Sequence, residues 1–147
     1  MIRTEKLTEL YNDLLAGGVL VASGSYHLKD DCDSVIVSDG AGRFGIFLDI
    51  EKIRTIAQET DAVSHEWAHW TSGATYPFDA APAIRQKAET RADRIQIEKL
   101  LPFDEMRGVI RGGVTQIYEL AEYFSVPEDL IRSAIDYYTG PKGLVFG

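Results

Sequence analysis

The sequence predicts an α+β fold in which a small antiparallel sheet precedes a helical bundle. Short apolar runs separated by Gly, Asp and Ser lie within residues 19–48, whereas apolar residues recur at helical spacing from Glu51 onward. Strands followed by helices favour this class over alternating βα units. The 147 residues, 45% of them hydrophobic, suffice for one packed core. We therefore expect a single domain over residues 1–147, divided into 1–102 and a C-terminal helical subregion, 103–147.

Each element follows from a local pattern. In the first helix, Leu7, Leu10 and Leu14 share one face, and Gly17-Gly18 can supply a left-handed C-cap. Gly and Pro residues separate the later helices, and Gly, Asp and Ser separate the strands. The expected helices are Thr4–Leu15, Ile53–Ser72, Pro82–Leu101, Phe103–Arg111, Thr115–Phe124 and Pro127–Tyr138, and the expected strands are Val19–Ala22, Ser34–Val37 and Gly45–Leu48.

The charge and the cysteine content narrow the possible ligands. Fifteen Lys and Arg against 23 Asp and Glu give a net charge of −8, so direct nucleic-acid binding is unfavourable. Cys32 is the single cysteine, so a metal site must use His, Asp and Glu. No segment resembles a signal peptide or a membrane span, and we expect a cytoplasmic protein.

The main motif is His65-Glu66-Trp67-Ala68-His69, an H-E-x-x-H pattern inside a predicted helix. Histidines at positions i and i+4 lie on one face, so both imidazoles can point at one metal ion. Glu66 is rotated by about 100° from His65 and can reach a water molecule activated by that ion. Val63, Trp67 and Trp70 lie on the opposite side, where we expect them to anchor the helix in the core.

A third ligand is expected because a hydrolytic zinc site uses three protein ligands and keeps one position open. Glu89 and Asp93 are spaced i, i+4 on the next predicted helix. We assign Glu89 to the metal and Asp93 to the outer N–H of a ligand histidine, and the opposite assignment stays open. Two simpler interpretations also remain: core or surface histidines, and a solvated acidic face paired with neighbouring Arg and Lys.

These motifs carry a family resemblance. H-E-x-x-H followed by Glu89-x-x-Ala92-Asp93 looks like the gluzincin arrangement of thermolysin-like peptidases. The continuation into Leu100-Leu101-Pro102, together with the later segment Leu120–Pro127, resembles the ImmA/IrrE family of metallo-endopeptidases. The resemblance covers about residues 35–138. The chain departs from the family pattern at Trp67-Ala68, where Leu-Gly is frequent, and at Pro127, where Ser is frequent.

The resemblance implies a zincin-like domain and a cytoplasmic zinc peptidase from a mobile element or a stress regulon, acting on a helix-turn-helix repressor. In that interpretation Zn²⁺ is the cofactor and Glu66 is the general base. The alternative is a zinc-binding regulatory module that acts through protein contacts, with catalysis absent or latent. A purely structural zinc site would need a fourth protein ligand, for which the sequence offers no clear candidate.

The remaining features have weaker functional interpretations. His27 and Tyr76 are candidates for stabilising an oxyanion, against the alternatives of a surface loop residue and of a tyrosine packed beside Pro77 and Phe78. The glycines of 40–45 are expected to form a hairpin turn and not a nucleotide loop. Cys32 is expected to be unreactive.

Two further expectations concern partners. Thr115–Tyr138 resembles a helix-turn-helix, but its second helix is poor in basic residues, so we interpret it as a structural or partner-binding pair. Residues 85–111 carry seven basic and five acidic side chains, a net +2, and could help to dock an acidic segment of a substrate.

Overall fold

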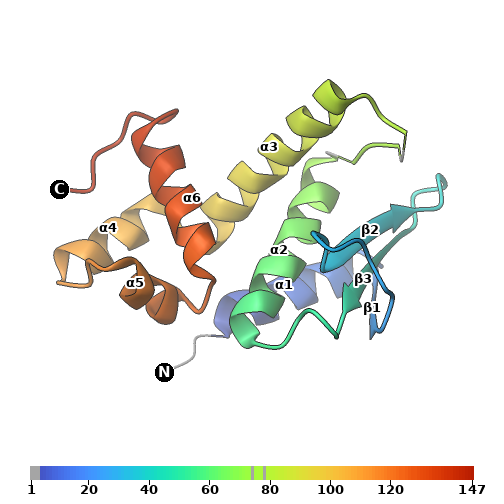
Figure 1. Ribbon diagram of the computed structural model, residues 1–147, viewed down its shortest axis with the longest axis horizontal. Coiled ribbons are helices and arrows are strands. Elements are labelled where there is room, and N and C mark those ends of the chain that lie inside the picture. The colour runs from blue at the N-terminus through green and yellow to red at the C-terminus, as the bar shows by residue number, and fades with distance from the viewer. Residues whose placement is uncertain (1–3, 74, 78) are drawn as a thin grey trace.

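The computed structural model describes residues 4–73, 75–77 and 79–147, which form three strands and six helices (Figure 1). The elements are α1 (Glu5–Ala16), β1 (Leu20–Gly24), β2 (Ser34–Ser38), β3 (Phe44–Asp49), α2 (Ile56–Ser72), α3 (Pro82–Leu100), α4 (Phe103–Arg111), α5 (Ile117–Phe124) and α6 (Glu128–Thr139). The predicted α+β class is confirmed, and every predicted helix and strand is present with small shifts at its ends.

The sheet is mixed, so the expectation of an antiparallel sheet is wrong for one strand pair. The strand order is β1-β3-β2, with β2 antiparallel and β1 parallel to β3. Residues 39–43 form a short hairpin between β2 and β3, which forces an antiparallel pair. Residues 25–33 instead carry the chain from β1 past β3 to the far edge, and β1 therefore runs parallel to its neighbour.

The glycines of the β2–β3 connection form a turn, as predicted. Gly40 and Gly42 have φ values of +79° and +87°, a region that glycine adopts without a steric penalty. The Asp39 carboxylate accepts hydrogen bonds from the backbone N–H groups of Ala41 and Arg43 at 2.8 and 3.1 Å, which closes the turn. No helix starts here, so the segment lacks the geometry of a dinucleotide loop.

Helix α2 lies at the centre of the molecule. It contacts α1, α3 and one face of the sheet, while α4, α5 and α6 gather on the side away from the sheet (Figure 1). The core between these elements is apolar, and Leu10, Leu14, Ile46, Val63 and Ile131 are fully buried in it. The helix that carries the H-E-x-x-H motif is therefore held on several sides.

The C-terminal helices α5 and α6 form the predicted helix pair. Ser125 ends α5 in the left-handed conformation, with φ +55°, and the N–H of Val126 donates to the carbonyl of Ala121 at 3.1 Å. Pro127 then precedes α6, where its fixed φ favours a helix start. Within the described residues no helix combines the length and the apolar character that a membrane span requires.

Candidate metal centre

Helix α2 is fixed at both ends, which sets the direction of its histidines. Thr55 and Gln58 form a capping box at its start, so the helix begins at Ile56 and not at the predicted Ile53. Gly73 ends it in the left-handed conformation, with φ +67°. Between these ends His65 and His69 lie on one face, and Val63 on the opposite side is fully buried.

The two tryptophans of α2 are partly buried against the core and do not lie fully inside it. The Nζ of Lys99 lies 5.6 Å from the centroid of the Trp67 ring, so a cation covers the ring that the core leaves open. The predicted anchoring role therefore holds fully for Val63 and in part for Trp67 and Trp70.

Helix α3 lies against α2 and is held in register by Gln96. The Gln96 Nε2 donates to the backbone carbonyl of Asp61 and to the Ser64 Oγ, each at 2.9 Å. Ala92 is fully buried at the contact, and its small side chain lets the two helices approach closely. This register brings Glu89 opposite the two histidines.

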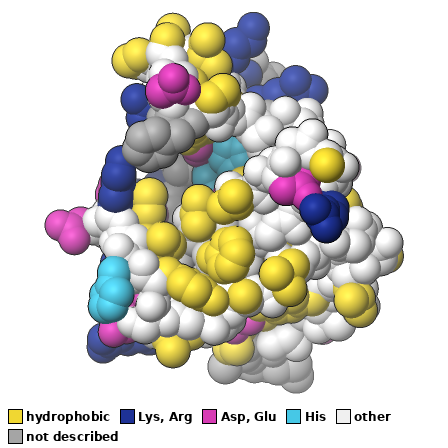
Figure 2. All heavy atoms as spheres, turned by 90° about the vertical axis from the view of Figure 1, so that its right-hand side faces the viewer, with side chains coloured by type: hydrophobic (Ala, Val, Ile, Leu, Met, Phe, Trp, Pro, Cys, Tyr) yellow, Lys and Arg dark blue, Asp and Glu magenta, His cyan; other side chains and the backbone are white. Residues whose placement is uncertain are grey.

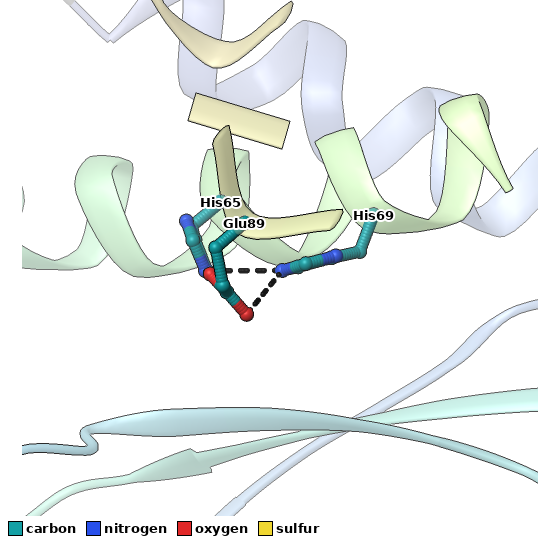
Figure 3. A group of neighbouring side chains, drawn as sticks. All are labelled: His65, His69 and Glu89. Atoms are coloured by element: carbon teal, nitrogen blue, oxygen red, sulfur yellow. Dashed lines mark hydrogen bonds and ion pairs between the residues drawn. The ribbon is translucent and has the colours of Figure 1, made fainter. Parts of the chain in front are cut away.

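His65, His69 and Glu89 converge on one point (Figure 3). The Nε2 atoms of His65 and His69 are 3.2 Å apart, and each lies 3.1 Å from a carboxylate oxygen of Glu89. His69 is 3% exposed, whereas the side chains of His65 and Glu89 are 28% and 34% exposed. The cluster is therefore accessible from outside, and Figure 2 shows histidine and acidic side chains within a hollow of the surface.

Hydrogen bonds and a metal ion are alternative ways to satisfy this arrangement. With a proton on each Nε2, the N–H groups of His65 and His69 can donate to different oxygens of Glu89, Oε2 and Oε1, both at 3.1 Å. With the protons on the other ring nitrogens, two lone pairs 3.2 Å apart and a carboxylate face one another, which is a donor set that suits a cation. The residues therefore fit a metal ion.

Asp93 lies on the outer side of His65, as the sequence predicts. Its Oδ1 is 3.5 Å from the His65 Nδ1, the nitrogen that does not face the cluster. A carboxylate there favours the tautomer with the proton on Nδ1, which leaves the Nε2 lone pair free for a metal. The structure thus brings Glu89 into the cluster and places Asp93 beside it, next to the outer nitrogen of His65.

Glu66 is buried next to the cluster, with only 4% of its surface exposed. The Ser34 hydroxyl, at the start of β2, donates to its Oε2 at 2.7 Å. Burial raises the pKa of the Glu66 carboxyl, while the charge of His65 and the Ser34 hydrogen bond oppose that rise. A carboxylate with a raised pKa and a fixed orientation is suited to accept and return a proton.

Tyr76 reaches the cluster from the loop between α2 and α3. Its hydroxyl donates to the Glu89 Oε1 at 2.8 Å, and burial together with this hydrogen bond raises the Tyr76 pKa to about 12. The tyrosine therefore orients a cluster carboxylate, a role that we did not predict. Phe78, the expected packing partner, lies outside the described residues.

Interactions within the cluster shift the pKa values of both Glu89 and His65. Hydrogen bonds from His65 and His69 hold the pKa of Glu89 well below its usual range. Burial alone would lower the pKa of His65, but the hydrogen bond to Glu89 and the charge of Glu66 outweigh it and raise that pKa to about 9. The carboxylate of Glu89 is therefore ionised and available as a ligand at neutral pH.

His27 and Cys32, the other two residues considered from the sequence, lie outside the candidate metal centre. His27 is an exposed loop residue whose Nδ1 is 3.9 Å from Glu51, in agreement with the surface interpretation. Cys32 is also an exposed residue, and partial desolvation of its thiol together with the charge of Asp31 raises its pKa. A raised pKa lowers the thiolate fraction, so the structure gives no support to a reactive role.

Ser34 is a residue of the candidate site that the sequence did not reveal. It lies 32 positions before Glu66, on a different element, and no local motif links them. Only the packing of β2 against α2 brings the hydroxyl to the carboxylate.

Comparison with known proteins gives no further assignment. The chain matches no protein-family model, no curated protein and no solved structure.

Proposed function

We propose that the chain is a zinc-dependent endopeptidase in which His65, His69 and Glu89 hold the metal and Glu66 is the general base. The observation that carries the proposal is that one possible ligand atom from each of the three residues lies within 4.8 Å of the other two, with the two histidine Nε2 atoms 3.2 Å apart. Ligands bonded at about 2.0 Å to a four-coordinate zinc ion lie ~3.3 Å apart by tetrahedral geometry. The distance between the two histidine nitrogens matches one edge of such a site, and the Glu89 carboxylate, with one oxygen 3.1 Å from each nitrogen, can supply the third ligand. A fourth position would be left for solvent or substrate.

The residues around the cluster supply the proton transfers of hydrolysis. A zinc ion held here would polarise the scissile carbonyl and acidify water at the site. The Glu66 carboxylate takes the proton of the attacking water and returns it to the leaving amine. The Ser34 hydroxyl holds the Glu66 Oε2 in place, so Ser34 is a positioning residue for this base. Asp93 performs the corresponding role for His65.

A free strand edge supports a peptide as the substrate. Strand β2 pairs with β3 alone among the described strands, so its other edge keeps unpaired backbone groups. An extended peptide can add to such an edge through main-chain hydrogen bonds. Because Ser34 begins β2 and also contacts Glu66, a peptide on this edge would pass beside the general base.

The family resemblance extends the proposal to a cytoplasmic enzyme whose protein substrate is a helix-turn-helix repressor. The chain's own helix pair does not favour direct DNA binding. Arg132 is the only basic residue of α6, and it is paired with Asp129 at 3.2 Å and Glu128 at 3.5 Å. The net charge of −8 acts in the same direction.

The test combines zinc analysis with proteolysis. Zinc-loaded protein and a Glu66→Gln variant are incubated with the repressor encoded beside the gene, and the products are identified by intact mass. We expect both proteins to bind one zinc ion per chain and only the wild type to cut the repressor. Equal cleavage by Glu66→Gln would refute the role of Glu66. Zinc binding without cleavage by the wild type would favour a regulatory module instead.

A further inference from the structure

A cavity adjoins the candidate metal centre on the Asp93 side of His65. It has a volume of about 250 Å³ and lies between α2, α3, α6 and the start of β2. His65 and Ser34 line it, so one wall is shared with the metal cluster and another with the residue that holds Glu66. A group in this cavity would therefore lie next to the reacting atoms.

The cavity is acidic. Among the described residues, Asp33, Asp61, Asp93 and Asp129 line it, and no Lys or Arg does. Asp129 is the most solvated of the four, at 97% side-chain exposure, and it is paired with Arg132. Burial raises the pKa of Asp61, and the charges of Asp33 and Asp93 add to that rise, against the Gln96 hydrogen bond and the charge of His65. Like charges that line one cavity favour a cationic occupant.

Gln96 gives an independent indication that the cavity takes a hydrogen-bond donor. This side chain lines the cavity and is 2% exposed. Its Nε2 donates to the Asp61 carbonyl and Oδ1 and to the Ser64 Oγ, and those acceptors fix the amide orientation. No hydrogen bond from the described residues reaches the Gln96 Oε1, which is left as an acceptor at the cavity wall.

We propose that this acidic cavity receives an arginine or lysine side chain of the substrate, next to the scissile bond. The inference rests on the proposed endopeptidase function for the position of the bond, but not for the binding of the side chain. A volume of about 250 Å³ is smaller than the ~300–1,000 Å³ of pockets that enclose whole small-molecule ligands, so it suits a single side chain. Arginine fits best, because its planar group offers five donors to carboxylates and to the Gln96 Oε1.

A basic side chain in this cavity differs from the acidic substrate segment that we expected from the net positive charge of residues 85–111. The basic residues Arg91 and Arg94 are exposed on α3, and the Arg94 guanidinium lies 5.5 Å from the centroid of the Tyr137 ring. The side of α3 that lines the cavity carries Asp93 and Gln96. The basic excess is therefore on a different surface from the cavity.

Binding is tested without any cleavage. Zinc-loaded, ¹⁵N-labelled Glu66→Gln protein is titrated with acetyl-arginine amide and with acetyl-citrulline amide, which has nearly the same shape and no charge. We expect the arginine compound to shift the backbone signals of residues 33, 61 and 96 and to bind at least tenfold more tightly than the citrulline compound. Equal binding of the two, or shifts elsewhere only, would overturn the proposal.

Isosteric variants locate the effect. Asp33→Asn and Asp61→Asn, made in the same Glu66→Gln background, should each weaken arginine binding about tenfold, the usual loss for one charged hydrogen-bond acceptor. Asp13→Asn, an exposed change on α1, is the matched control and should leave binding unchanged. Full affinity in both cavity variants would contradict the assignment of the site.

Cleavage separates this proposal from the proposed function. Zinc-loaded wild-type protein is given a proteome-derived peptide library, and the cut positions are read by mass spectrometry. We expect Arg and Lys to be enriched at one position next to the cut, and Asp33→Asn to reduce that enrichment about tenfold. Cleavage without basic enrichment would overturn the cavity proposal and leave the peptidase intact. Arginine binding without cleavage would support the cavity and contradict the endopeptidase.

Discussion

The hydrogen bond from Tyr76 to Glu89 predicts that Tyr76→Phe weakens zinc binding about tenfold. The 2.8 Å bond is made to an ionised carboxylate, and such bonds contribute ~1.5–3 kcal/mol when buried. Because the Glu89 side chain is 34% exposed, we take the lower end of that range, which corresponds to about a tenfold loss. Replacing a residue that orients a metal ligand costs 10–100-fold in other sites, roughly the same magnitude.

A competition titration against a chromophoric zinc chelator measures this loss. Tyr118→Phe, which removes the hydroxyl of an exposed tyrosine on α5, is the matched control and should keep the wild-type affinity. A zinc affinity for Tyr76→Phe within twofold of the wild type would refute the positioning role. If the same variant lost only turnover, Tyr76 would instead act on the substrate's oxyanion.

The other predictions concern stability and are measured by denaturant or thermal unfolding. Leu10→Ala removes a fully buried side chain and should cost about 2–5 kcal/mol, lowering Tm by roughly 5–15 °C, and a change under 2 °C would contradict its core position. Gly73→Ala should cost about 1 kcal/mol through its φ of +67°, since nothing lies within 4 Å of the added Cβ, and Gly73→Asn should cost less. The folded pKa of Asp61 is raised above its unfolded value, so its contribution to stability is present below about pH 4 and is lost as pH rises through the folded pKa. The free energy of unfolding of Asp61→Asn, relative to that of the wild type, should therefore rise between pH 4 and pH 7. A fall of this relative stability over the same interval would show that the pKa shift has the opposite sign.

The sequence predicted well what depends on spacing along one helix. His65 and His69 share a face because they are one turn apart, and the same is true of Glu89 and Asp93, so each pair follows from helical periodicity. Helical periodicity does not predict that the histidine pair of α2 and the acidic pair of α3 lie next to each other. This placement needs the register that Gln96 sets between α2 and α3, which no local pattern contains.

What the sequence could not predict depends on contacts between distant segments. The parallel pairing of β1 with β3 is a choice among strand orders that the same apolar runs allow. Ser34 reaches Glu66, and Tyr76 reaches Glu89, only after β2 and the α2–α3 loop are placed in space. The acidic cavity likewise collects single aspartates from separate elements, and each of them looks like an ordinary surface acid in the sequence.

The most direct test of the proposed metal centre is the zinc content of purified variants, measured by native mass spectrometry. The wild type and Glu66→Gln should each carry one zinc ion, because Glu66 is not among the three proposed ligands. His69→Ala and Glu89→Ala should carry none at the same zinc concentration, with circular dichroism confirming that each is folded. One zinc ion retained by folded His69→Ala or Glu89→Ala would contradict the assignment of the three ligands.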